Sequence, residues 1–179
     1  PKYDEMRGYS EGTWAPALRH HNGEFYIFVC TPADGLFMWH AKNPAGPWSQ
    51  TVTVKAIPRW EDPCPFWDDD GQAYLVHSLR GAGPLIIHKM SPDGTKLLDD
   101  GQEVYRGPNA EGPKMHKRNG YYYISLPEGG FSRGGVTRGV FRVERREALP
   151  VPPPSVATSF LAGARRTARV GSQGRRCNG

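Results

Sequence analysis

Two acidic side chains and one tryptophan recur at nearly equal spacing along the chain. Trp14, Asp62 and Glu111 are separated by 48 and 49 residues, and a proline follows each of them within two positions. Two carboxyl groups beside an aromatic ring suit the hydrolysis of a glycosidic bond. One carboxylic acid protonates the leaving oxygen, and the second activates water or attacks the sugar. The ring offers the sugar a flat apolar face and raises the pKa of a neighbouring carboxyl by desolvation.

Glu111 is the candidate general acid. Gly112 follows it and would let the backbone approach a ligand closely, and a glutamate reaches further than an aspartate. Asp62 would hold the pKa of Glu111 up by like-charge repulsion. The alternative is that each acidic residue is a solvated or capping residue near a turn. Recurrence of all three residues in one phase of a repeat favours a shared site.

The segments that position these residues are predicted to be β-hairpins. Turn dipeptides follow each candidate residue at Asn22-Gly23, Asp70-Gly71 and Asn119-Gly120. Such dipeptides favour the primed two-residue turns of β-hairpins. Residues 35–46 match residues 83–94 and indicate a third strand in each of the first two repeats.

Outer strands at 50–55 and 102–105 complete units of four strands, which is typical of a β-propeller blade. The predicted fold class is therefore all-β, a propeller in which the first strand of every blade faces a central funnel. Residues 132–143 could still form strands, but they lack the pattern shared by residues 35–46 and 83–94. We therefore count about two and a half blades. Propellers need roughly four or more blades. Three alternatives follow: segments outside the chain complete the ring of blades, several copies of the chain self-assemble, or the propeller stays open.

We divide the chain into a partial propeller at residues 1–147 and a tail at residues 148–179. The tail is Pro-rich, then basic and without periodicity, which predicts disorder. Residues 1–160 hold 18 basic and 18 acidic residues, so the net charge of +5 belongs to the tail. We therefore expect no nucleic-acid partner, with tail-borne binding as the minor alternative. No apolar run reaches membrane-spanning length and no signal peptide opens the chain. We expect no membrane partner and leave the location open.

Metal and cofactor sites are not predicted. The three cysteines lack metal-ligand spacing, and we interpret Cys30 and Cys64 as buried free thiols. The acidic run 68–70 is ordinary turn chemistry. We interpret His40 and His88 as structural residues. No cofactor is expected, and a structural calcium ion is the alternative.

Three stretches together resemble glycoside hydrolase family 43, whose members are five-bladed propellers that act on xylan and arabinan side chains. They are residues 12–26, 62–76 and 111–123, and the resemblance runs from about Gly12 to Gly130. It implies that Glu111 is the general acid and that Asp62 tunes the pKa of the acid and orients the sugar. It implies that Trp14 binds substrate. Glu128, within residues 127–130, matches a loop that often reaches the pocket and is the second substrate-binding candidate.

The resemblance also implies an inverting reaction, with acid and base about 6.5–9.5 Å apart. The family's base is an aspartate on a blade before the Trp-Ala-Pro strand. Only 13 residues precede Trp14, and Asp4 and Glu5 do not align with that base. We expect a β-xylosidase or α-L-arabinofuranosidase acting on pentose-containing hemicellulose, with xylo- or arabino-oligosaccharide substrates and activity lowered by the missing blade. The alternative is a non-catalytic carbohydrate-binding propeller fragment.

Overall fold

The protein is described by a computed structural model that covers residues 12–81, 83–107, 110–128 and 137–143. These residues form three antiparallel β-sheets and no helix, which confirms the all-β fold class. No helix long and apolar enough to cross a membrane occurs in this part of the chain. Residues 148–179 lie outside it, so the boundary before the tail stays a prediction.

The first two sheets each contain four strands in the order of the sequence, as predicted for propeller blades. The first sheet consists of β1 (Trp14–His21), β2 (Glu24–Thr31), β3 (Gly35–Ala41) and β4 (Val52–Lys55). The second consists of β5 (Trp60–Trp67), β6 (Ala73–Leu79), β7 (Leu85–Met90) and β8 (Gln102–Tyr105). Asn22 and Gly23, between β1 and β2, have φ of 48° and 78°, as a primed two-residue turn requires.

The third sheet has three strands in its described part, ordered β11-β10-β9. They are β9 (Lys114–Arg118), β10 (Tyr121–Glu128) and β11 (Thr137–Val143). Asn119 and Gly120 join β9 to β10 with φ of 52° and 75°, again a primed turn. Strand β11 falls where the sequence repeat had lost its pattern, so a strand persists there without the histidine and the Pro-Gly turn of the other sheets.

The connection between β5 and β6 differs from the predicted two-residue turn. Gly71 has a φ of 83°, whereas Asp70 is not in the left-handed region. The backbone N–H of Gly71 donates to the carbonyl of Asp68 at 3.0 Å, and the N–H of Asp68 donates to the carbonyl of Gln72 at 2.9 Å. The loop is therefore longer, with glycine alone in the left-handed position.

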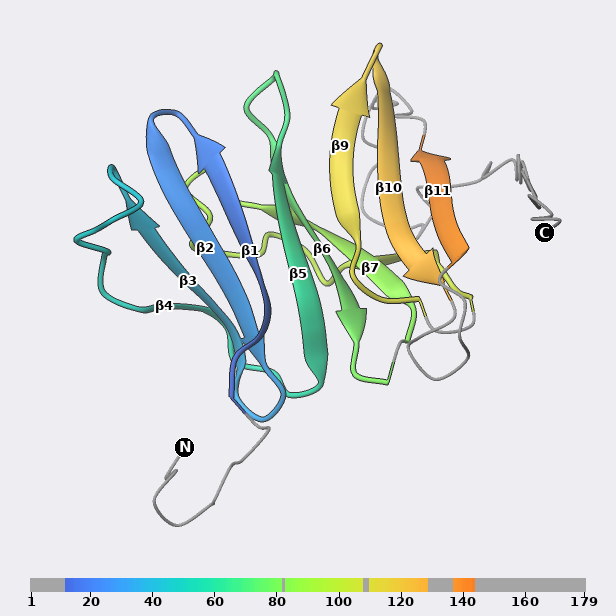
Figure 1. Cartoon of the computed structure of the whole chain (residues 1–179), viewed down its shortest axis with the longest axis horizontal. Helices are drawn as coiled ribbons and strands as arrows, with labels where there is room; N and C mark the ends of the chain where they lie inside the picture. Colours follow the sequence, from blue (N-terminus) through green and yellow to red (C-terminus); the bar gives the residue numbers. More distant parts are fainter. Residues whose placement is uncertain (1–11, 82, 108–109, 129–136, 144–179) are drawn as a thin grey trace, which may run out of the picture.

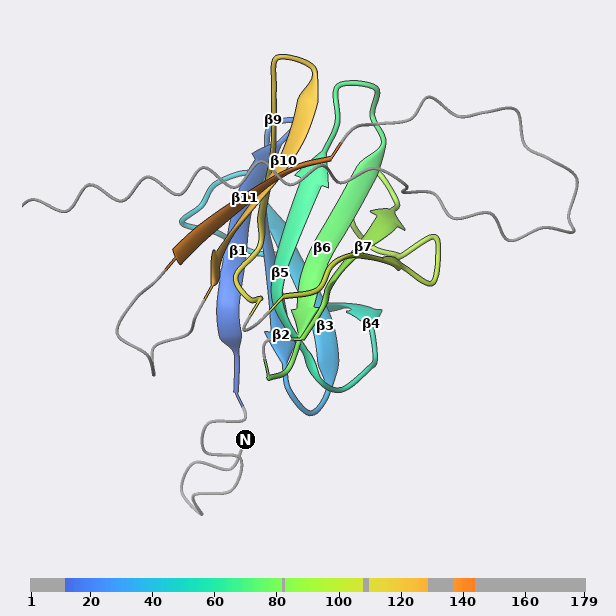
Figure 2. The same cartoon turned by 90° about the vertical axis from the view of Figure 1, so that its right-hand side faces the viewer.

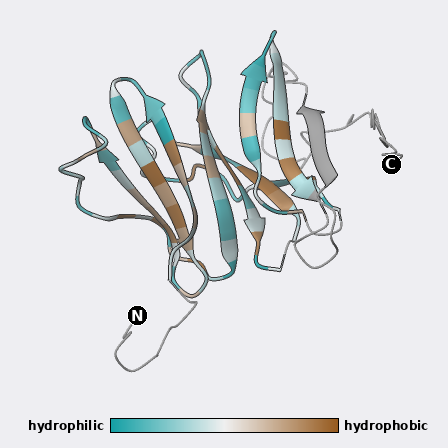
Figure 3. Ribbon diagram, viewed as in Figure 1, coloured by the Kyte–Doolittle hydropathy of each residue, from teal (hydrophilic) through white to brown (hydrophobic). Residues whose placement is uncertain are grey.

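The three sheets stand side by side like blades, and their first strands β1, β5 and β9 are neighbours (Figure 1). The turns β1–β2, β5–β6 and β9–β10 lie at one edge in Figure 1, and the last two also point the same way after a quarter turn (Figure 2). The beginnings of the first strands therefore share the opposite edge. Apolar residues alternate with polar ones along β10 (Figure 3), as expected for a strand packed on one face.

Two apolar clusters fill the spaces between neighbouring sheets. Phe28 and Met38 of the first sheet pack with Leu75 of the second, and all three are fully buried. On the other side of the second sheet, Val76 packs with Ile124 of the third. The second sheet is thus covered on both faces and holds its first strand, β5, between β1 and β9.

The structural interpretation of several polar residues is confirmed. Cys30 and Cys64 are buried free thiols. His88 is buried, and its Nε2 lies 3.1 Å from Nε2 of His77. Trp60, the first residue of β5, stacks on the His77 ring with a centroid distance of 3.7 Å.

The acidic run after β5 does more than form a turn. Asp68 is buried, and its carboxylate accepts hydrogen bonds from Lys117 Nζ at 2.6 Å and from the Tyr122 hydroxyl, both on the third sheet. Burial alone would raise the pKa of Asp68. The hydrogen bonds from Lys117, Tyr122 and the Asp69 backbone outweigh burial and hold this pKa below its usual value. Asp68 therefore anchors the second sheet to the third.

Candidate active site

Strands β1 and β5 carry a β-bulge at the same place, where each strand begins. The pairing register shifts within Trp14–Ala17 in β1 and within Glu61–Cys64 in β5. Ala15 and Asp62 lie inside these bulges with φ of 37° and 55°, in the left-handed region. A bulge removes one residue from the ladder and changes the direction of nearby side chains. In both bulges the left-handed residue is followed by proline, which cannot donate to the ladder.

The strand pairing corrects the predicted alignment of the repeats, because the connection from β5 to β6, counted between equivalent pairs, is one residue longer than that from β1 to β2. Trp14 pairs with Cys30, and Glu61 pairs with Ser78 at the corresponding place in the second sheet. Glu61, rather than Asp62, is therefore the structural equivalent of Trp14. The predicted equivalence of Asp62 with Trp14 and Glu111 is wrong by one residue.

The segment before β9 follows the same pattern. Gly112 has a φ of 58° and precedes a proline, as Ala15 and Asp62 do. Trp14, Glu61 and Glu111 thus occupy one position of the repeat, and Ala15, Asp62 and Gly112 occupy the next. Counting back from the prolines, at positions 16, 63 and 113, would have identified Glu61 from the sequence.

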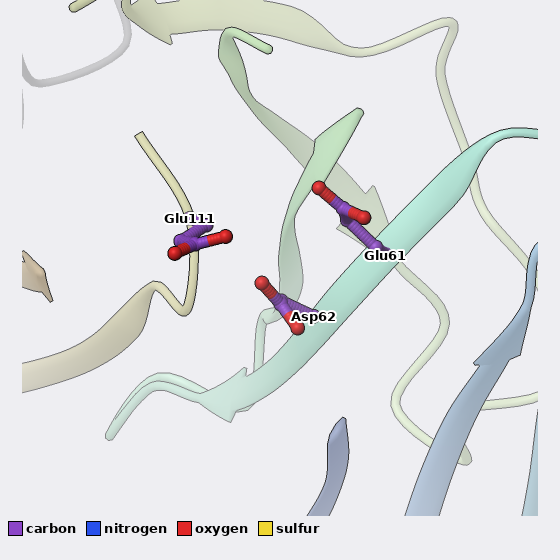
Figure 4. A group of neighbouring side chains, drawn as sticks. All are labelled: Glu61, Asp62 and Glu111. Carbon is purple, nitrogen blue, oxygen red and sulfur yellow. The ribbon is translucent and has the colours of Figure 1, made fainter. Parts of the chain in front are cut away.

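Three carboxylates converge where the second sheet meets the third (Figure 4). Oxygen atoms of Glu61, Asp62 and Glu111 all lie within 4.8 Å of one another. Consecutive residues of a regular strand point to opposite faces. The left-handed backbone at Asp62 breaks this alternation, so Glu61 and Asp62 both face Glu111. Asp62 and Glu111 are therefore brought together, as predicted.

Asp62 is tied to the segment that carries Glu111. Its Oδ2 accepts a hydrogen bond of 2.7 Å from the backbone N–H of Gly112, and Ser78 Oγ lies 3.5 Å from the same oxygen. A Cβ at Gly112 would stand 3.3 Å from the Pro127 ring, in a backbone conformation that favours glycine. Glycine is needed here because Pro127 lies close and the backbone is left-handed. The predicted reason, close approach of a ligand, was a different one.

Trp14 lies on the strand that packs against β5 and is half-buried. The Arg80 guanidinium stands 5.2 Å from the centre of its ring, a cation–π contact. Burial, together with the negative charges of Asp62 and Glu61, raises the pKa of Cys30, which pairs with Trp14, to about 12. Trp14 is thus placed on the strand next to the one that carries Glu61 and Asp62. Glu128 ends β10 and pairs with Thr137 there, but its side chain lies outside the described part.

The carboxylate oxygens lie close enough together to contact one cation. Calcium takes about six to eight oxygen ligands, and one oxygen of Asp62 already accepts the Gly112 N–H. Such a close group of acids is equally suited to proton transfer. The expectation of no metal stays a prediction.

Known proteins resemble this chain in sequence and in fold. Residues 1–153 match the profile of glycosyl hydrolases family 43. A Xylanibacter ruminicola protein, provisionally named a beta-xylosidase, is 56% identical over 137 residues, which cover 76% of this chain and 26% of that protein. A beta-xylosidase of Formosa agariphila is 39% identical, with coverage of 72% and 24%. The chain thus spans about a quarter of the length of these relatives.

Solved structures show the same arrangement of strands. GH43B of a Bacteroides ovatus xyloglucan locus superposes with a TM-score of 0.66 at 31% identity, over 80% of this chain and 30% of that one. BlXynB of Bacillus licheniformis gives 0.64 at 28% identity, over 75% and 28%. These matches confirm the resemblance drawn from the three repeats and the incomplete propeller. The chain belongs to glycosyl hydrolases family 43.

Proposed function

We propose that the chain hydrolyses glycosidic bonds of pentose-containing oligosaccharides, with Glu111 as the general acid. The convergence of the Glu111 and Asp62 carboxylates at the meeting of two sheets carries this proposal. Relatives named beta-xylosidase and non-reducing end alpha-L-arabinofuranosidase support xylose or arabinose as the sugar.

Each predicted residue has a distinct task in this reaction. Glu111 protonates the oxygen of the bond as it breaks. Asp62 fixes the backbone after Glu111 through Gly112 and so holds the acid in place, while its carboxylate orients the sugar. Trp14 offers an apolar face against which a pentose ring packs.

The proposed reaction inverts the anomeric centre. In inverting enzymes the acid and the base stand about 6.5–9.5 Å apart to leave room for water. Oxygens of Asp62 and Glu61 come within 4.8 Å of Glu111, so we assign neither as the base. Within the described ranges Glu111 and Asp62 supply proton donation and orientation, and water activation falls to another carboxylate.

Proton NMR of the reaction mixture tests this proposal. The chain is incubated with xylobiose or an arabinofuranosyl oligosaccharide, and the anomer released first is recorded before mutarotation. From a β-linked xyloside, inversion releases α-xylose first, whereas β-xylose would contradict the inverting reaction. Sugar binding without any product would favour the alternative, a carbohydrate-binding propeller fragment.

A further inference from the structure

We propose that Glu61 is a further substrate-binding residue of this site, where its carboxylate accepts hydrogen bonds from hydroxyl groups of the sugar whose bond is cleaved. This inference rests on the proposed function. It adds a residue to which neither the spacing of the motifs nor the comparisons with known proteins assign a role.

The position of Glu61 in the repeat is the first argument. Glu61 stands in β5 where Trp14 stands in β1 and where Glu111 stands before β9, each two residues before a proline. The proposed function uses two of these three equivalent residues, one as the sugar platform and one as the acid. The sheet between them presents Glu61 at the same edge, toward the same space.

The burial of Glu61 is the second argument. Its exposed fraction is 7%, and its carboxylate faces those of Asp62 and Glu111 rather than solvent (Figure 4). Burying a carboxylate is costly, and placing it beside two others adds like-charge repulsion. The backbone at Asp62 also adopts a left-handed conformation that keeps both acids on one side. A fold bears such costs at sites that bind or react.

The chemistry of the carboxylate is the third argument. Glu61 already interacts within the protein, and an ionised carboxylate has about four acceptor sites, so it can accept further hydrogen bonds. An ionised carboxylate only accepts hydrogen bonds, and those bonds are stronger than neutral ones. Sugar hydroxyls are donors of this kind. Glu61 is therefore suited to holding the hydroxyls while Asp62 and Glu111 serve the reacting bond.

Isothermal titration of Glu61→Gln with xylobiose tests the inference. Loss of a charge-assisted hydrogen bond predicts an affinity about tenfold or more below that of the wild-type chain. Glu61→Asp should recover part of the loss. Glu103→Gln is the matched control, because Glu103 is exposed on the outer strand β8 and should leave the affinity unchanged. Unfolding midpoints of all variants report whether folding is preserved.

A set of monodeoxy xylosides separates direct binding from a structural effect. Removing the hydroxyl that Glu61 binds should lower the sugar affinity of the wild-type chain but not that of Glu61→Gln, so the two losses of affinity are not additive. Equal affinity of Glu61→Gln and wild type, or additive losses for every hydroxyl, would overturn the inference. If the wild-type chain binds no sugar, the proposed function fails as well. If it binds sugar and only the Glu61 effects are missing, the proposed function stands.

Discussion

The carboxylate of Asp62 accepts a hydrogen bond of 2.7 Å from the backbone N–H of Gly112, the residue directly after Glu111. This bond joins β5 to the segment that leads into β9, across the boundary between two sheets. It holds the candidate acid at a fixed place relative to Asp62. Both residues of this contact have a positive φ, 55° at Asp62 and 58° at Gly112.

Asp62→Ala should abolish most of the activity and lower stability. It removes the acceptor for Gly112 and leaves a half-buried N–H without its bond, which costs about 1–3 kcal/mol of unfolding free energy. Loss of positioning at the acid should reduce kcat about 100-fold. Aryl-pentoside kinetics and urea unfolding measure the two effects. Asp62→Asn keeps an acceptor oxygen and should lose less stability; equal kcat for Asp62→Ala and wild type would refute the role.

Trp14→Ala should weaken sugar binding about tenfold, because the apolar face of the ring is lost. Trp14→Phe keeps a smaller ring and should retain most of the affinity. Xylobiose titration measures both constants. The role of Trp14 as an apolar face for the sugar is wrong if the Trp14→Ala and Trp14→Phe variants bind the sugar equally well.

Asp68 makes stability depend on pH in acid. Its pKa is held below the ordinary 3.8, so its contribution is present above about pH 4 and disappears as the pH falls through the lowered value. Asp68→Asn should cost about 1–3 kcal/mol at pH 7 because the buried Tyr122 hydroxyl loses a charged partner. Urea unfolding at pH 7 and pH 3 checks this. The exposed neighbour provides the control: Asp69→Asn should cost under about 0.5 kcal/mol, and equal costs would contradict the anchor.

The buried histidines predict a second pH dependence, in a higher range. Burial, together with the neighbouring His88, lowers the pKa of His77 from 6.5 to about 3. As the pH falls, His77 of the unfolded chain is protonated before that of the folded chain. The free energy of unfolding therefore keeps the full contribution of His77 above about pH 6.5 and loses it as the pH drops toward 3.

His77 alone changes the free energy of unfolding by at most about 1.4 kcal/mol per pH unit. His77→Asn should flatten the curve between pH 6.5 and 4 in urea unfolding, while the exposed His116→Asn should leave it unchanged. A wild-type stability that is constant over this range would contradict the assignment.

Most of the architecture was predictable because turns and strands follow from local patterns. Asn22-Gly23 and Asn119-Gly120 form the expected primed turns, and residues 102–105 form the expected outer strand. Glu61 was missed as the equivalent of Trp14 because the connection from β5 to β6, counted between equivalent pairs, is one residue longer than that from β1 to β2, which shifts the motif spacing by one residue. The proline two residues after Trp14, Glu61 and Glu111 carried that information.

Other features depend on contacts that local patterns do not encode. Lys117, the partner of Asp68, lies on another sheet 49 residues later, and only the packing of the sheets shows that the turn acid is an anchor. The proximity of Glu61 to Glu111 likewise depends on the left-handed backbone at Asp62. Asp62 was still predicted to lie near Glu111 because it is only one residue from Glu61, which occupies the repeat position of Glu111, and a repeat places such positions of neighbouring blades together.

The dependence of hydrolysis on the leaving group tests the role of Glu111 most directly. Wild type and Glu111→Gln are compared on xylobiose, whose leaving group needs a proton, and on 2,4-dinitrophenyl β-D-xylopyranoside, whose leaving group does not. If Glu111 is the general acid, kcat/KM of the variant should fall about 10²–10⁴-fold on xylobiose and far less on the aryl xyloside. Equal losses on both substrates, or unchanged turnover of xylobiose, would contradict the assignment.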